Sequence, residues 1–316
     1  MLWVMARKLR LQFQGAIYHV MNRGDHQEPI FRGVTDRELF LKTLGQACEK
    51  TDWQVHAWCL MSNHFHLVVE TPQPNLVAGM KWLLGTYTAR FNRRHKLFGH
   101  LFSGRYKALF VDGSGTGYLK SACDYVHLNP VRAKLLRRSQ RLREFRWSSF
   151  GEYLKSPAAR PGWLRTGRLL GEHGIQKDSP AGRAEFEKRL ELRRASEDLE
   201  HQEELMGGWC LGSEQFRQEL LEQMNERKGA DHYGAEIRES ATEKAERLLK
   251  EQLGRLGWRE LDLTAHRKGA PEKLEIASRL RKETTMTLAW IAQRLQMGTK
   301  THLSHLLYWQ QRRAAN

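Results

Sequence analysis

The segment from His64 to Glu70 constrains the fold most, because a His-Phe-His triplet there opens an apolar run typical of a β-strand. Side chains two residues apart share one face of a strand, so His64 and His66 point to one side and Phe65 to the other. Two imidazoles on one face can hold a divalent ion above the sheet. The triplet alone equally fits two half-buried strand histidines that bind nothing.

The order of the elements around this triplet narrows the fold further. Apolar runs predict strands at residues 16–21, 55–61, 64–69 and 106–111, and helical spacing predicts helices at residues 35–51 and 76–98. This β-α-β-β-α-β order is that of a split-βαβ, ferredoxin-like sheet, an α/β (α+β) fold whose first and third strands are central neighbours. A further helix begins near Gly117, must bend or end near Pro130, and is free to pack beside the sheet.

The composition favours a polyanionic partner. Lys and Arg number 52 against 36 Asp and Glu, which gives a formal net charge of +16. Nucleic acid is the usual partner of such a chain. An anionic membrane is the competitor, but no apolar run approaches the roughly 20 residues that span a bilayer. The first ten residues lack the core of a signal peptide and the four cysteines lack paired spacing, so we expect a cytoplasmic protein with reduced thiols.

A second motif lies on the helix after the fourth strand. Tyr125 and Asn129 are four residues apart and occupy neighbouring positions on one helix face. A phenol, with a pKa of about 10, attacks phosphodiesters only when the phosphate is polarised, for example by a metal ion. The imidazoles of His64 and His66 with the amide oxygen of Asn129 suit Mg²⁺ or Mn²⁺. The Asn-Pro pair also predicts the end of a helix, and the two interpretations are compatible.

Other tyrosine and histidine side chains near these motifs are weaker candidates for a catalytic role. Tyr118 lies seven residues before Tyr125 on roughly the same face, which makes it an alternative nucleophile. It has Ala122, which has no amide side chain, four residues later, so we expect it to be a packing residue. We expect His19 and His127 to be structural residues or polar neighbours of the site.

Several blocks of the first 150 residues resemble one family. His64-Phe65-His66 is similar to the histidine–hydrophobe–histidine signature of single-tyrosine HUH transposases, and the segment from Tyr125 to Ala133 resembles the nucleophile segment of REP-associated tyrosine transposases. Residues 15–20, 22–24 and 29–31 resemble the N-terminal region of that family.

The resemblance implies a tyrosine transposase that nicks DNA and transfers strands. It implies metal-dependent cleavage of single-stranded DNA at or near a hairpin, with a 5′-phosphotyrosyl link and a free 3′-hydroxyl as products. It carries over Tyr125 as the nucleophile and His64 and His66 as metal ligands. Asn129 carries over less directly, because related enzymes often have a glutamine on that helix.

Basic residues flank both motifs. No acidic residue lies between Arg90 and Lys107, and Glu144 is the one acid between Arg132 and Arg146. Neutralisation of phosphates dominates DNA affinity, so these runs favour a DNA groove over an ordinary solvated face. We expect DNA contacts from Arg90, Arg93, Arg94, Arg105, Lys107 and Arg132 and, from the resemblance alone, Arg23.

The patterns divide the chain into a catalytic domain at residues 1–156, a charged helical linker region at residues 157–235 and a helical C-terminal domain at residues 236–316. In the last, helices near residues 276–280 and 288–295, a tight turn at residues 296–298 and a final helix match a helix-turn-helix. Such a unit reads duplex DNA, with Lys300, Thr301 and His302 as candidate contacts, although an ordinary helical hairpin has the same pattern.

Two other functions fit the same sequence. One is a catalytically idle DNA-binding regulator on the HUH scaffold, and the other is an RNA-binding or RNA-processing protein, since this topology also suits RNA. For the transposase we expect a monomer or a homodimer.

Overall fold

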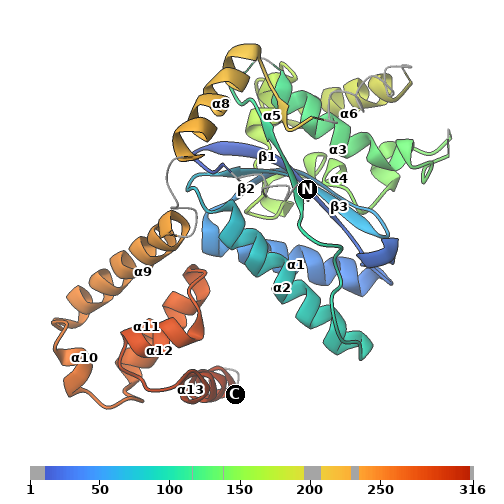
Figure 1. Ribbon diagram of the computed structural model, residues 1–316. Coiled ribbons are helices and arrows are strands. Elements are labelled where there is room, and N and C mark those ends of the chain that lie inside the picture. Colours follow the sequence, from blue (N-terminus) through green and yellow to red (C-terminus); the bar gives the residue numbers. More distant parts are fainter. Residues whose placement is uncertain (1–10, 116, 138, 196–207, 229–234, 314–316) are drawn as a thin grey trace, which may run out of the picture. The chain divides into compact units, whose positions relative to one another are not determined.

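Five strands of the described chain form one sheet in the order β2-β3-β1-β4-β5 (Figure 1). The computed structural model describes residues 11–115, 117–137, 139–195, 208–228 and 235–313. The strands are β1 (Ala16–Arg23), β2 (Gln54–Leu60), β3 (His64–Thr71), β4 (Lys107–Val111) and β5 (Cys210–Leu211). The first four pair antiparallel, and β5 is added to β4 in parallel. The expected ferredoxin-like order is therefore confirmed, with β1 and β3 as central neighbours.

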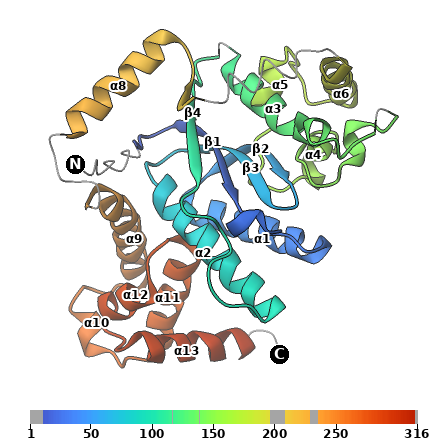
Figure 2. The same ribbon diagram turned by 45° about the vertical axis from the view of Figure 1, so that its right-hand side comes forward.

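Helices cover both faces of this sheet (Figures 1 and 2). The helices around it are α1 (Val34–Thr51), α2 (Leu76–His95), α3 (Tyr118–Arg132), α4 (Phe150–Tyr153), α5 (Gly167–Glu172), α6 (Pro180–Ala195) and α8 (Glu214–Lys228). Helices α1 and α2 cover one face, where the ring of Phe65 packs against Phe40 at 4.9 Å between centroids. Helix α3 packs on β2, β3 and β4 from the other side.

The alternation in β3 explains which side chains reach which face. Phe65 and Leu67 are fully buried on the side of α1 and α2, so apolar burial fixes the strand register. A slip of one residue would exchange these side chains with His64 and His66. The hydrophobic face thus determines that both histidines point toward α3.

Residues 157–195 were expected to be a charged helical linker, but in the structure they pack on the sheet and α3. Only Phe186 and Leu190 of α6 are fully buried, and the ring of Phe186 stacks on Tyr153 at 5.0 Å. Helices α5 and α6 both contact α3. Charged residues dominate this sequence, but a few well-spaced apolar side chains suffice to attach it to the sheet unit. Within the described residues, this unit extends beyond residue 156 to the end of α8.

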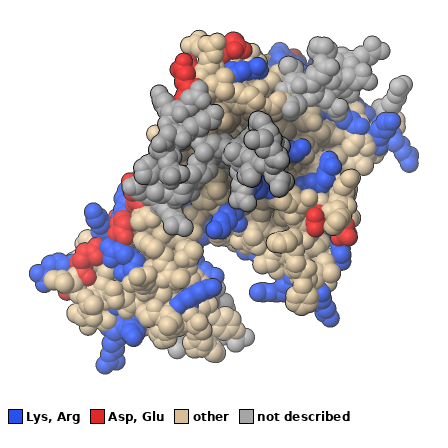
Figure 3. Space-filling model, viewed as in Figure 1, with Lys and Arg blue, Asp and Glu red and all other residues tan. Residues whose placement is uncertain are grey.

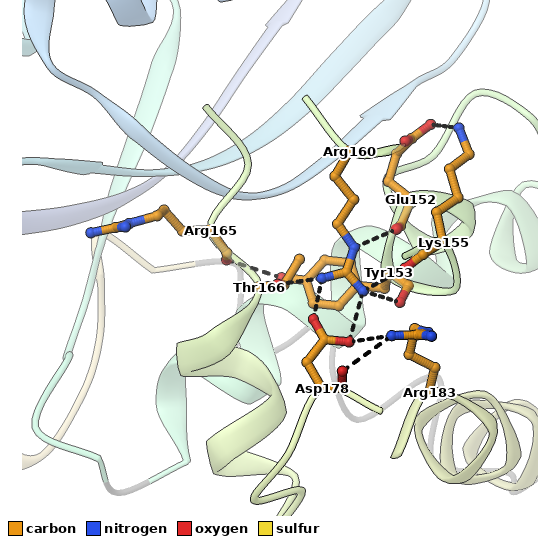
Figure 4. Close-up of polar contacts among 8 residues, drawn as sticks. All are labelled: Glu152, Tyr153, Lys155, Arg160, Arg165, Thr166, Asp178 and Arg183. Atoms are coloured by element: carbon orange, nitrogen blue, oxygen red, sulfur yellow. Dashed lines mark hydrogen bonds and ion pairs between the residues drawn. The ribbon is translucent and has the colours of Figure 1, made fainter. Parts of the chain in front are cut away.

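Arg160 joins several loops of this region (Figure 4). Its side chain is 5% exposed and pairs with Asp178. It also donates to the carbonyl oxygens of Glu152 at 3.0 Å, Tyr153 at 2.9 Å and Lys155 at 2.8 Å. The guanidinium therefore holds the end of α4 against the loop before α6.

The C-terminal helices form a second unit with its own core. They are α9 (Ala235–Leu256), α10 (Asp262–Ala265), α11 (Pro271–Glu283), α12 (Leu288–Arg294) and α13 (Lys300–Arg313) (Figure 2). Buried Ile276, Ile291 and Leu303 belong to one apolar cluster. The turn before α13 includes Gln296 and Gly298, both with positive φ. The bounds of α11, α12 and α13 agree with the helices expected from the sequence.

The structure also bears on the cysteines and on membrane-spanning helices. The four cysteines are free and buried in the structure. No helix within the described ranges is long and apolar enough to cross a membrane. The expectation about a signal peptide concerns residues 1–10, which lie outside the described residues.

Candidate active site

Strand pairing collects polar side chains on the face of the sheet covered by α3. Directly opposed residues of antiparallel strands point to the same side. Arg23 opposes His64, and Met21 opposes His66 on one side and Lys107 on the other. Two basic side chains therefore share a face with the two histidines.

His64 is oriented by its neighbour. Its Nδ1 lies 2.7 Å from Oδ1 of Asn63, an oxygen that can only accept, so Nδ1–H donates and Nε2 keeps a lone pair. Burial, followed by the charge of Arg23, lowers the pKa of the His64 imidazole to about 4. The ring is neutral at neutral pH and available as a ligand.

His66 contacts both His64 and His19. The ring centroids of His64 and His66 are 5.1 Å apart, and Nδ1 of His66 lies 2.9 Å from Nε2 of His19. Burial, then the neighbouring imidazoles and arginines, holds the pKa of His66 well below its usual value, and burial lowers that of His19 to about 4. His19 is therefore a polar neighbour of the site that orients His66. His127, in contrast, bonds to the Ser149 hydroxyl at 2.8 Å and is structural.

Helix α3 brings Tyr125 to this histidine cluster. The Tyr125 ring lies 6.0 Å from the His66 ring and 5.7 Å from the His19 ring, both edge-on. The guanidinium carbon of Arg132 stands 4.3 Å from the centre of the Tyr125 ring, and Arg132 also donates to the Tyr125 carbonyl oxygen at 2.9 Å. The phenol is thus held between imidazoles and a cation, a placement suited to phosphate chemistry. None of the described ring contacts joins Tyr118 to these histidines.

The donor set can be tested against a divalent ion. No group of three or more His, Cys, Asp or Glu side chains in the described part of the chain is arranged to hold a metal. A site would therefore need the Asn129 amide beside His64 and His66. Nδ2 of Asn129 is buried and has no hydrogen-bond partner among the described residues, and rotation of the amide would place its oxygen there. An unpartnered buried amide and two neutral imidazoles fit a divalent ion, although none of the described contacts joins Asn129 to either histidine.

Asp124, which the sequence did not single out, anchors the helix of Tyr125 from behind. Its carboxylate is fully buried, accepts a hydrogen bond from His173 Nε2 at 3.0 Å, and pairs with Arg193 of α6. A buried carboxylate between two partners fixes the position of α3. The signal in the sequence is an acidic residue on the apolar side of a helix.

Most of the residues that were expected to contact DNA are exposed. In the sheet unit these are Arg23, Arg93, Arg105 and Lys107, and on α13 of the second unit they are Lys300, Thr301 and His302. Arg132 is half-buried. Arg90 instead bonds to Thr43 at 2.6 Å and to Gln46 at 2.8 Å, and Arg94 pairs with Asp36 at 3.2 Å. Arg90 and Arg94 thus have structural partners that the basic run did not reveal. Figure 3 shows lysine and arginine side chains distributed over one face.

The chain is similar to known proteins over the part that contains this site. Residues 12–129 match the family model "Transposase IS200 like", a range that includes both histidines, Tyr125 and Asn129. Among solved structures, one described as "Structure of the REP associates tyrosine transposase bound to a REP hairpin" is similar at 13% identity and a TM-score of 0.40, over 50% of this chain and 91% of that chain. No curated protein matches the sequence.

Proposed function

We propose that the chain, whose residues 12–129 match the model of the IS200-like transposase family, nicks single-stranded DNA at or near a hairpin and transfers the cut strand, with Tyr125 as the nucleophile. The observation that carries this proposal is the position of Tyr125, whose ring lies 6.0 Å from His66 on the face that both strand histidines share. The neighbouring Tyr118 has no such position.

The proposed reaction is an in-line displacement at phosphorus. The Tyr125 oxygen forms a bond to phosphorus while the bond from phosphorus to the 3′-oxygen breaks. The phenol proton passes to water and the 3′-oxygen gains a proton, which leaves a 5′-phosphotyrosyl link and a 3′-hydroxyl. Strand transfer is the reverse step with a different 3′-hydroxyl.

The surrounding side chains have separate tasks in this proposal. Arg132 restrains the Tyr125 ring, and Arg23 and Lys107 contact the phosphates on either side of the scissile one. His64, His66 and Asn129 would hold a Mg²⁺ or Mn²⁺ ion, which would supply Lewis-acid polarisation of the scissile phosphate.

The second unit has a targeting role in the same proposal. Lys300, Thr301 and His302 are exposed at the start of α13. The chain from Thr284 onward contains no acidic residue, so this surface suits a polyanion. We assign it to the major groove of duplex DNA beside the hairpin.

A nicking assay tests the proposal. The full chain is incubated with Mn²⁺ and a single-stranded oligonucleotide from the DNA that flanks the gene, and the products are separated on a denaturing gel. The oligonucleotide carries one label at its 5′ end, which reports the nick, and a second label at its 3′ end, which reports the protein–DNA adduct. Tyr125→Phe should abolish both the nick and the protein–DNA adduct, and Tyr118→Phe, the matched control, should retain both. DNA affinity should stay within a few-fold in both variants, because only a hydroxyl is lost.

The alternatives give different results. DNA binding without a nick in the wild type indicates an idle regulator. Cleavage of RNA without a covalent adduct indicates an RNA-processing enzyme. An adduct that persists in Tyr125→Phe refutes the assignment of the nucleophile.

A further inference from the structure

Phe98, in the loop between α2 and β4, is the most exposed large apolar side chain of the described residues, at 98%. We propose that it stacks on an unpaired base of the DNA held at the candidate active site. This inference rests on the proposed function and adds a base contact to it. An aromatic ring that stands in water is stabilised when a partner covers it, because apolar surface is then removed from water.

The loop holds Phe98 in a defined position. The turn after α2 includes Lys96 with φ 54° and Gly99 with φ 91°, a value that favours glycine. Asn92 fixes both sides of the turn, since its side chain donates to the Gly99 carbonyl at 3.0 Å and its carbonyl accepts from the Leu97 amide at 2.9 Å. Phe98 is therefore presented from a constrained turn, which lowers the entropy lost when the ring stacks.

The same loop is joined to the strand end at the candidate site. The Ser103 amide donates to the Arg23 carbonyl at 2.9 Å, and the Asp25 amide donates to the Leu101 carbonyl at 3.0 Å. Arg23 in turn opposes His64 in the sheet. With strands about 4.8 Å apart, the backbone that anchors the loop lies roughly 10 Å from that of His64. The three residues from Leu101 to Phe98 add at most about 10 Å. A strand of a few nucleotides spans the resulting distance.

The charges around Phe98 favour nucleic acid over a protein partner. Arg93, Lys96 and Arg105 are exposed, and no acidic residue occurs between Arg90 and Lys107. Nearby carboxylates have partners: Asp36 pairs with Arg94 and His95, and Asp25 lies 3.8 Å from His26. One aromatic ring among cations is the arrangement with which proteins stack bases of unpaired strands. Among the described residues of the loop from 96 to 106, Leu97 is the other large apolar side chain that is exposed, at 37%, and these two side chains offer far less apolar surface than a stable protein interface needs.

Fluorescence anisotropy with two probes tests the inference. One probe is a hairpin oligonucleotide with a single-stranded 5′ extension, and the other is the same stem as a blunt duplex. Phe98→Ala should weaken binding of the extended hairpin roughly tenfold, since stacking contributes about 1–3 kcal/mol per base, and should change duplex binding less than twofold. Phe98→Trp keeps a ring and should bind as the wild type does, whereas Phe98→Leu should behave as Phe98→Ala. Leu97→Ala, the matched apolar control, should have no effect.

Salt dependence separates stacking from phosphate contact. The slope of log affinity against log salt should be unchanged in Phe98→Ala and shallower in Arg105→Ala. Equal affinity of Phe98→Ala and wild type for the extended hairpin, with nicking by Tyr125 intact, refutes the stacking alone. A Phe98→Ala variant with normal DNA affinity but an altered sedimentation coefficient shows a protein contact instead. A wild type that binds neither probe refutes the proposed function itself.

Discussion

The contact between α3 and the segment after it leads to a quantitative prediction about Asp124. This carboxylate is fully buried, and its partners, His173 and Arg193, both lie outside the residues that match the transposase family. Replacing it with alanine leaves the guanidinium of Arg193 and the His173 ring without their acceptor. Removal of one member of a buried ion pair costs about 3–5 kcal/mol. The Arg193 side chain is 29% exposed and regains some water, so we expect about 3 kcal/mol for Asp124→Ala.

Hydrogen exchange measures this cost where it arises. The chain has two units and need not unfold in one step, so exchange of peptides from α3 reports the local free energy of opening better than a global transition does. Asp124→Ala should accelerate exchange of α3 and lower the melting temperature of the sheet unit by about 6–12 °C, at roughly 2–4 °C per kcal/mol. Asp124→Asn keeps an acceptor for His173 and should lose less.

Loss of the Asp124 carboxylate should also reduce nicking, because Tyr125 follows Asp124 directly on the helix. A matched control is Lys188→Ala, which removes an exposed cation from the same helix, α6. A change in the opening free energy of α3 below 1 kcal/mol in Asp124→Ala would refute the reasoning, as would an equal effect of Lys188→Ala.

Three further outcomes are expected. Hydrogen bonds from Arg160 and Arg183 outweigh burial and hold the pKa of Asp178 below its usual value. The stability that this pair adds is present above the unfolded pKa of about 3.9 and is lost as the pH falls through the lower folded value. The free energy of unfolding in urea should therefore decrease less from pH 7 to pH 3 in Arg160→Gln than in the wild type. His64→Ala and His66→Ala should each remove most nicking, and chelation should inactivate the wild type reversibly; full activity in excess chelator contradicts the metal proposal. Alanine at positions 300–302 together should weaken binding of duplex-flanked hairpins about tenfold and leave nicking of short single strands unchanged, as gel-shift and nicking assays can measure.

The fold of the sheet could be predicted because its strands follow local periodicity. Alternation in β3 and the order of the first four strands determined which face His64 and His66 share. The strand β5 was not predicted. Cys210–Leu211 is too short to show the alternation of a strand, and its pairing depends on β4, about 100 residues earlier. The packing of α6 was also not predicted, because its buried Phe186 and Leu190 are outnumbered by charged residues whose partners lie in other elements.

The candidate site could be predicted only in part, because some of its contacts join residues that are far apart in the sequence. Spacing placed Tyr125 and Asn129 on one helix face, and the structure brings Tyr125 to His66. The bond of His66 to His19 depends on strand register across 47 residues, which no local pattern contains. Arg90 has its partners on α1, and a run of basic residues does not show which of its members are engaged in packing.

Mass spectrometry of the trapped protein–DNA adduct tests the central claim most directly. Trypsin cleaves after Lys120 and Arg132, so Tyr125 lies in the peptide of residues 121–132 and Tyr118 in that of residues 108–120. After reaction with single-stranded DNA and Mn²⁺, nuclease and trypsin digestion should yield the 121–132 peptide with a nucleotide attached to Tyr125 through its 5′-phosphate. A nucleotide on the 108–120 peptide, or cleaved DNA with no modified peptide, would contradict the account.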